Sequence, residues 1–222
     1  MRKLVISVFF LLALPALASA QNLFNAQEQS APAGHPYRQA FDPLWQRVLQ
    51  AEKQSPSFNK NGDGFGRIDR NTWRNLVQYA SQSTDIERLQ MVNGYFNQCP
   101  PKQDSDAWQT PEYWCTPREF MKQRGGDCED YAIAKYFALR YLGFEARHMR
   151  IVIVRQRDEK GTFLPSLHAV LAVHRKIGGK DNWYILDNNA RPRDNIFPHL
   201  QYGGRFVPLY SINEDGAWVH GK

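Results

Sequence analysis

The chain has 222 residues, of which 42% are hydrophobic and 23% are charged, and this balance excludes an intrinsically disordered protein. Its formal net charge of +6 is scattered along the sequence without a long run of like charges, which argues against nucleic-acid binding. One compact domain is the default for this length.

The first twenty residues are typical of a secretory signal peptide. Arg2 and Lys3 precede an apolar run from Leu4 to Leu14, and the small residues that end at Ala20 offer a cleavage site. The run is too short to cross a membrane as a helix, so we expect an exported protein and no integral membrane protein. Removal of residues 1–20 leaves 26 basic and 22 acidic residues, a net charge of +4.

Residues 21–40 are polar and interrupted by Pro and Gly, which predicts a flexible or loosely docked leader before a single domain at 41–222. Apolar residues then recur at spacings of three and four, which predicts three amphipathic helices within 41–96. Between the first two, Asn59–Gly64 resembles the start of an EF-hand loop. Arg70 stands where that loop needs a carboxylate, so we interpret the segment as a turn.

The second half of the chain changes from helix to strands. The spacing of apolar residues predicts a helix over 127–141, with Gly143 as its C-terminal stop. β-Branched and aromatic runs then predict strands at 149–154, 167–173, 183–186, 206–212 and 217–220. Helices first and an antiparallel sheet second indicate the α+β class.

Cys128 stands in the first turn of the predicted 127–141 helix, directly after Gly125, Gly126 and Asp127. Unpaired N–H groups and the helix dipole favour a thiolate at that position, and nearby N–H groups can bind an oxyanion. The residue is therefore a candidate nucleophile. The alternative is a small buried residue that follows an Asp N-cap.

A cysteine nucleophile needs a base, and His168 and His174 are the two histidines within or directly beside a predicted apolar strand. If Gly178 and Gly179 form a two-residue turn, the residue opposite Asp187 lies two positions from His168 on the same face of the sheet. A carboxylate there can orient the imidazole, whereas His174 lies nearer the turn. We therefore predict a Cys-His-Asp arrangement of Cys128, His168 and Asp187.

Asp127, Glu129 and Asp130 surround the candidate nucleophile with negative charge, which raises the pKa of a thiol. Calcium bound by these carboxylates would offset the charge and fix the glycine turn. A capping cluster at the helix N-terminus, without metal, explains the same residues. Zinc is less plausible because the three cysteines show no C-x-x-C spacing.

Cys99 and Cys115 lie in a Pro-rich stretch, and an oxidising compartment would permit a disulfide between them. Two buried free thiols are an equally good interpretation, since pairing cannot be deduced from sequence. If that disulfide forms, Cys128 is the cysteine left over.

Four blocks of the sequence together resemble the bacterial transglutaminase-like cysteine proteases, and within them the LapG type. The first combines Tyr113-Trp114 with Thr116-Pro117 and Glu119-Phe120, and the others are GGDCEDYAIAKYFALRYLG from Gly125, LHAVL from Leu167 and YILDN from Tyr184. The resemblance extends from about Trp73 to Tyr210. It implies a papain/transglutaminase-like α+β fold, with N-terminal helices packed on an antiparallel sheet.

The resemblance also implies roles for individual residues. Cys128 would be the nucleophile, His168 the general base and acid, and Asp187 the orienting carboxylate. Proteases of this type are calcium-dependent, with the acidic residues beside the cysteine as ligands. That implies calcium at Asp127 and Glu129, with Asp130 as a further candidate.

The family also implies a substrate, a regulator and a compartment. Its members cleave a large adhesin held at the outer membrane, near the N-terminus and within a di-alanine site, so that cells leave a biofilm. An inner-membrane cyclic-di-GMP receptor sequesters the protease through its periplasmic domain. We therefore expect a periplasmic endopeptidase that binds no nucleic acid.

Two other functions remain open from the sequence. A protein-glutamine transglutaminase shares the acyl-enzyme but passes the acyl group to a lysine amine. A catalytically silent periplasmic binding module would use the same cleft to hold an adhesin or receptor, and the intact Cys, His and Asp set argues against it.

Overall fold

The computed structural model describes residues 22–59, 67–202 and 204–221. The expected signal peptide at 1–20 lies outside these residues. Of the turn expected at Asn59–Gly64, the structure describes only Asn59. Among the described residues, no helix combines the length and the apolar character that crossing a membrane requires.

From Pro36 onward the predicted order of helices followed by strands is confirmed. The helices are α1 (Pro36–Gln54), α2 (Arg67–Ala80), α3 (Asp85–Phe96), α4 (Asp104–Ala107), α5 (Pro117–Gln123) and α6 (Cys128–Tyr141). The strands are β1 (Gln27–Ser30), β2 (Met149–Arg157), β3 (Phe163–Ile177), β4 (Lys180–Leu186), β5 (Phe197–Pro198), β6 (Phe206–Ile212) and β7 (Ala217–Gly221). Short 3-10 helices lie at Leu23–Asn25, Ala146–His148 and His199–Tyr202. The structure thus adds four short elements that were not predicted: β1, α4, α5 and β5.

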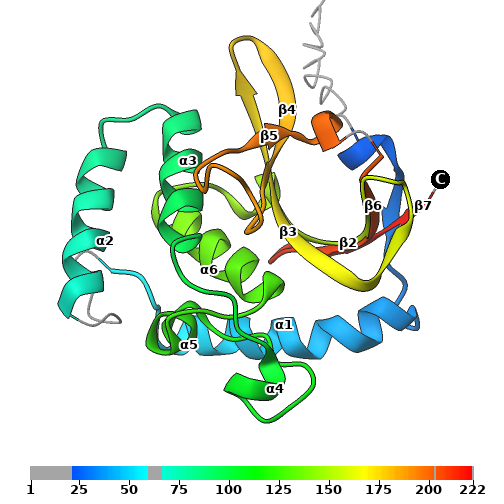
Figure 1. The fold of residues 1–222 in the computed structure, drawn as a ribbon, viewed down its shortest axis with the longest axis horizontal. Coiled ribbons are helices and arrows are strands. Elements are labelled where there is room, and N and C mark those ends of the chain that lie inside the picture. Colours follow the sequence, from blue (N-terminus) through cyan, green and yellow to red (C-terminus); the bar gives the residue numbers. More distant parts are fainter. Residues whose placement is uncertain (1–21, 60–66, 203, 222) are drawn as a thin grey trace, which may run out of the picture.

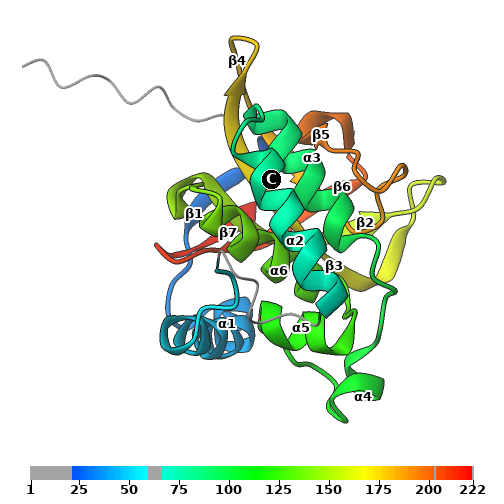
Figure 2. The ribbon, with the colours of Figure 1, turned by 90° about the vertical axis from the view of Figure 1, so that its left-hand side faces the viewer.

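The strands form one antiparallel sheet in the order β1-β7-β6-β2-β3-β4-β5. It curves strongly at the right of Figure 1, while the helices gather on its left and along its lower side. Turning the molecule separates α1, α5 and α4 below the sheet from α2 and α3 beside it (Figure 2). This is the α+β arrangement expected from the sequence.

Residues 21–40, predicted as a flexible or loosely docked leader, instead contribute a strand and the start of a helix from residue 22 onward. Leu23 is fully buried, and β1 pairs with β7 at the edge of the sheet. Helix α1 already begins at Pro36, with His35 as its N-cap. Strand β1 could not be predicted from apolar periodicity, because its residues are polar and it contributes backbone hydrogen bonds rather than an apolar face.

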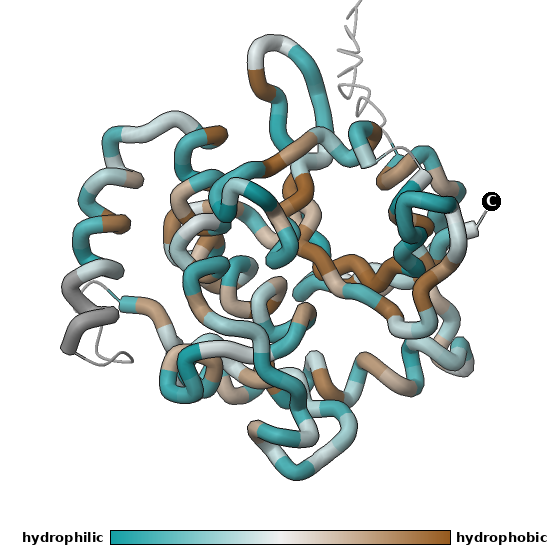
Figure 3. The backbone as a smooth tube through the Cα atoms, viewed as in Figure 1, coloured by the Kyte–Doolittle hydropathy of each residue, from teal (hydrophilic) through white to brown (hydrophobic). Residues whose placement is uncertain are grey.

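Both faces of the central strands are buried. On one face, side chains of β2 and β3 such as Ile151 and Leu171 join the large core beneath the helices. On the other face, Val152 and Val170 join Leu23 and Phe206 in a second core inside the curve of the sheet. Figure 3 shows the resulting hydrophobic stretch along the middle strands. Burial on both sides explains the unbroken apolar runs in the sequence.

Helix α6 lies at the centre of the large core, against β3 and β2 on one side and against α3 and α5 on the other. Small side chains such as Ala134 and Ala138 are fully buried and let the helix approach its neighbours closely. The N-terminus of α6 is thereby fixed beside the middle of β3.

Candidate active site

Two glycines set the position of Cys128. Gly125 adopts a φ of 150°, and a side chain there would collide with the carbonyl oxygen of Pro100. A Cβ on Gly126 would lie 2.3 Å from Asp130 Oδ2. The chain can therefore turn tightly into α6, with Cys128 as its first residue, only because both side chains are absent.

Replacement of Gly126 by alanine is expected to destabilise the protein by about 2 to 4 kcal/mol, because the new methyl group overlaps a buried carboxylate. Thermal unfolding of Gly126→Ala measures the effect. Gly34→Ala is the matched control, since a Cβ at Gly34 meets no atom within 4 Å. Equal melting temperatures for the two variants would contradict the packing described here.

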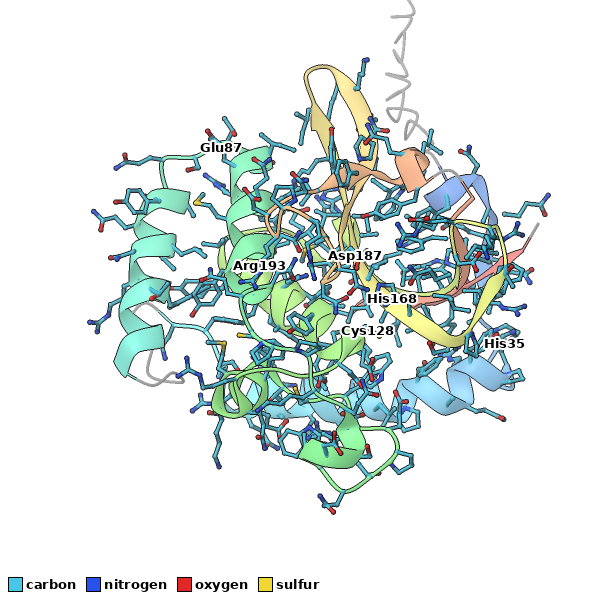
Figure 4. All side chains as sticks on the ribbon, viewed as in Figure 1. His35, Glu87, Cys128, His168, Asp187 and Arg193 are labelled. Carbon is cyan, nitrogen blue, oxygen red and sulfur yellow. The ribbon has the colours of Figure 1, made fainter. Side chains whose placement is uncertain are left out.

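The predicted hairpin register of β3 and β4 is confirmed: Leu171 pairs with Leu186, and Ile177 pairs with Lys180. It brings His168 and Asp187 together, with Nε2 of the imidazole 3.0 Å from Oδ1 of the carboxylate. Both side chains are buried. Figure 4 shows them beside Cys128 at the centre of the molecule.

The backbone of β3 contacts the sulfur directly. The N–H of Ala169, the residue after His168, donates to Cys128 Sγ at 3.3 Å. Because Nε2 of His168 is committed to Asp187, Nδ1 is the ring nitrogen left to exchange a proton with the thiol. The structure thus brings together the three side chains that the sequence singled out.

Asp187 is held as an anion in a fixed place. Burial opposes its ionisation, but hydrogen bonds from His168 and from the Asn189 N–H, together with nearby positive charge, lower its pKa overall. Directly after α3, the Asn97 side chain donates to the Asp187 carbonyl at 2.9 Å and to the Arg193 carbonyl at 2.8 Å. This role of Asn97 could not be predicted from the sequence, because an asparagine at the end of a helix does not indicate which distant backbone groups it contacts.

A cluster of three carboxylates lies next to the sulfur. Asp104, Asp127 and Glu129 each place an oxygen within 4.8 Å of the others. Cys128 Sγ donates to Glu129 Oε2 at 3.2 Å, so the cluster reaches the candidate nucleophile itself. Asp104 Oδ1 and Asp127 Oδ1 are buried without a hydrogen-bond partner among the described residues.

These carboxylates disfavour each other's ionisation. Burial, together with repulsion from Asp104 and Glu112, raises the pKa of Asp127 to about 6. Burial and the Asp127 charge raise the pKa of Glu129 well above its usual range, and burial also raises that of Asp104. Burial and the Glu129 and Asp127 charges likewise raise the pKa of the Cys128 thiol. The conflict between acids and thiolate anticipated from the sequence is therefore present.

The capping alternative does not explain this cluster. Asp127 is the N-cap of α6 by position, yet its side chain makes no capping hydrogen bond. An unpartnered buried carboxylate oxygen is costly, and oxygen-rich clusters of this kind suit a hard divalent cation. The donor set therefore fits calcium better than it fits a cap.

Asp104 was missed by the sequence analysis because it lies far from Cys128 along the chain. A single bridge between Pro101 and Gly126, with the Lys102 N–H donating to the Gly126 carbonyl at 2.9 Å, brings the two segments together. Asp104 then begins α4 beside the cluster and accepts a hydrogen bond from the Tyr113 N–H. No local pattern marks such a long-range bridge.

Asp130 has a different environment from the cluster. One of its oxygens accepts the Cys115 N–H at 2.8 Å, and burial with repulsion from Asp127 raises its pKa to about 8. Asp130 thus connects the segment before α5 to the first turn of α6.

The disulfide between Cys99 and Cys115, one of the two arrangements that the sequence left open, is not formed in the described residues.

A cleft of about 510 Å³ opens beside Cys128 and His168. Its apolar lining includes Phe41 and Trp114, whose rings stack at 5.5 Å. Leu167 also lines it and is 42% exposed. The candidate nucleophile is therefore reached from an open groove with aromatic walls.

The comparisons with known proteins agree with this geometry. The family model of the bacterial transglutaminase-like cysteine proteinases matches residues 69–221. Among solved structures, calcium-bound LapG of Legionella pneumophila is 27% identical, with a TM-score of 0.57, over 79% of this chain and 90% of that one.

A second LapG structure from the same organism is 28% identical, with a TM-score of 0.56, over 78% of this chain and 87% of that one. A search among curated proteins finds no match. The family match covers more than half of the sequence and includes Cys128, His168 and Asp187. The chain therefore belongs to the bacterial transglutaminase-like cysteine proteinases, and its fold is that of the LapG type.

Proposed function

We propose that this cysteine protease is a calcium-dependent endopeptidase with Cys128, His168 and Asp187 as its catalytic residues. The observation that carries the proposal is the meeting of three elements at one cleft. Ala169 on β3 touches the sulfur at the start of α6, and His168 bonds to Asp187 at the end of β4.

The reaction follows from these contacts. His168 accepts the thiol proton, and Cys128 Sγ attacks the peptide carbonyl to give a tetrahedral intermediate. The C–N bond then breaks as His168 returns the proton to the leaving amine, which leaves a thioester. His168 next deprotonates a water that attacks the thioester, releases the acid product and regenerates the thiol. Asp187 keeps the imidazole oriented throughout.

Asp104, Asp127 and Glu129 would hold the calcium ion. The fit rests on their mutual proximity and on the two unpartnered buried oxygens of Asp104 and Asp127. The chemistry that a bound cation supplies is neutralisation of carboxylate charge that otherwise raises the pKa of the Cys128 thiol. The calcium-bound and EGTA-treated LapG structures support the choice of metal.

The proposed substrate is a large outer-membrane-associated adhesin, cut in its N-terminal region at a di-alanine site, so that its release disperses a biofilm. Membership of the LapG-type family supports this substrate. An open groove walled by Phe41 and Trp114 suits an extended peptide whose residues beside the cut are small. Export to the periplasm and control by the periplasmic domain of an inner-membrane cyclic-di-GMP receptor belong to the same proposal.

Incubation of the purified protein with the N-terminal region of a large adhesin from the same organism tests the substrate. We expect one new N-terminus at a di-alanine site when calcium is present and none when EGTA replaces it. An intact adhesin under both conditions would reject this substrate. Cleavage that EGTA leaves undiminished would reject the calcium requirement.

A second experiment separates hydrolysis from amine transfer. The adhesin fragment is incubated with the enzyme and an excess of a primary amine, and the products are weighed by mass spectrometry. We expect the free acid to dominate. A dominant amine adduct would instead assign the protein as a transglutaminase, because the two activities share the acyl-enzyme and differ in what resolves it.

A further inference from the structure

The first half of β3 has one edge that no other strand covers. Strand β2 pairs with β3 from Phe163 to Val173 on one side. On the other side, β4 pairs with β3 only from Leu171 onward. Among the described residues, no strand therefore lies against this second edge between 163 and 170. An uncovered edge presents backbone N–H and C=O groups that can pair with another extended chain.

This open edge forms part of the wall of the active-site cleft. Residues 164–167 are exposed, whereas residues 168–173 are buried. Ser166, Leu167, His168 and Ala169 all line the cleft that contains Cys128. The open edge of β3 therefore faces free space beside the candidate nucleophile, and a chain that enters the cleft to be cut passes along it.

One hydrogen bond indicates which backbone groups point toward the cleft. The N–H of Ala169 donates to Cys128 Sγ at 3.3 Å, so it points away from β2. The register with β2 is regular from Leu167 to Ala169, and in an antiparallel strand every second residue directs its N–H and C=O to the same edge. Leu167 therefore offers one donor and one acceptor at the open edge, about 7 Å along the strand from Ala169.

Pro165 limits how far pairing at this edge can extend. The register between β2 and β3 shifts between Leu167 and Phe163, and Pro165 lies in this irregular part. Proline has no N–H and cannot donate to a further strand, which makes pairing with a second copy of the chain unfavourable. The edge is therefore suited to a short contact with a chain held in the cleft rather than to extension of the sheet.

We propose that the substrate binds as a short extended segment on the open edge of β3, through the backbone of Leu167. The Leu167 N–H donates to a carbonyl of the substrate, and the Leu167 carbonyl accepts from an N–H of the same substrate residue. The inference deepens the proposed function and rests on it, since the bound chain is the one that Cys128 cuts. Backbone pairing holds the chain extended beside the sulfur, while the walls of the cleft contact its side chains.

Leu167→Pro tests the pairing from the side of the enzyme, because it removes the donor without removing a bond between β2 and β3. We expect it to cleave the adhesin region about 10- to 100-fold more slowly at limiting substrate, since the substrate carbonyl loses its partner. Its melting temperature should stay close to that of the unmodified protein. Glu159→Pro, at the second position of the exposed turn at 158–161 in the same hairpin, is the matched control and should cleave at the unmodified rate.

Two further measurements separate backbone pairing from other effects of this substitution. Leu167→Ala keeps both backbone groups and should cleave at least about fivefold faster than Leu167→Pro. Alkylation of Cys128 by iodoacetamide, followed by mass spectrometry, should fall far less in Leu167→Pro than cleavage does, because the Cys-His-Asp arrangement is intact. Equal losses of cleavage in the two Leu167 variants would overturn the inference, and so would a loss of alkylation as large as the loss of cleavage.

N-methylation of the substrate tests the other hydrogen bond. The adhesin region is assembled by chemical ligation with a synthetic segment across the cut, in which one residue at a time carries an N-methyl group. At one position near the cut, N-methylation should slow cleavage by the unmodified protein about 10- to 100-fold, but less than about threefold in Leu167→Pro, where pairing is already lost. Equal effects on the two proteins at every position would overturn the inference.

Failure of the inference and failure of the proposed function give different results. If the unmodified protein does not cut the unmethylated adhesin region, the proposed function fails and the inference fails with it. If it cuts this substrate and Leu167→Pro cuts it equally fast, only the pairing with β3 is rejected.

Discussion

Replacement of Cys128 by alanine is expected to lower adhesin cleavage at least about a thousandfold, because loss of the nucleophile removes the acyl-enzyme route. The fold should persist. The substitution deletes one sulfur at the edge of an open cleft, where little cavity is created. The melting temperature should therefore move by no more than about 3 °C. Gel analysis with N-terminal sequencing of the adhesin measures cleavage, and calorimetry measures stability.

Cys99→Ala is the control for this experiment, since it removes a thiol from a position outside the cleft lining. It should cleave at the rate of the unmodified protein. If Cys128→Ala retained that rate too, the nucleophile would be another group. If the protein is a binding module, neither the unmodified protein nor any of the variants should cleave the adhesin.

The relation between His168 and Asp187 could be predicted from sequence because it depends on local rules. A two-glycine turn fixes the register of a hairpin, and register fixes which side chains share a face. Both Gly178 and Gly179 adopt positive φ, as such a turn requires. The start of α6 could also be predicted from the sequence, since Gly125 and Gly126 indicate a turn that larger residues cannot make.

Contacts between distant segments could not be predicted in the same way. Strand β1 exists because β7, near the other end of the chain, offers it a free edge. Asp104 reaches Asp127 only through the bridge between Pro101 and Gly126. In both cases the local sequence is polar and has no recognisable pattern. Its structural role depends on a partner far away in the sequence, and the tertiary fold determines which partner that is.

The two ends of the catalytic arrangement face opposite electrostatic demands. Asp187 must stay charged in the interior, and positive charge lowers its pKa. The Cys128 thiol lies beside carboxylates that raise its pKa, so its activation needs positive charge from outside the protein. Residues of the chain thus stabilise the charge of Asp187. In the proposed mechanism, the Cys128 thiolate instead depends on a bound cation. We therefore expect the acidic cluster to be the part of the site at which activity responds to calcium.

Asp104 provides the sharpest test of that dependence, because it is the member of the cluster that the sequence did not reveal. Asp104→Asn keeps the size of the side chain and an oxygen that can accept the Tyr113 N–H, while it removes one negative charge. We expect calcium to bind about 10- to 100-fold more weakly, since affinity follows the number of charged ligands. Cleavage should then fail at limiting calcium and recover when calcium is raised.

Stability gives an independent measurement of the same site. Burial raises the pKa of Asp104, so the metal-free protein pays for its ionisation, and Asp104→Asn should be as stable as the unmodified protein or more stable in EGTA. Calcium should stabilise the variant less, because weaker binding shifts unfolding less at a given concentration. Asp106→Asn, an exposed residue of the same short helix outside the cluster, should respond to calcium as the unmodified protein does. Identical calcium titrations of melting temperature and cleavage for Asp104→Asn and Asp106→Asn would show that the cluster does not hold the ion on which catalysis depends.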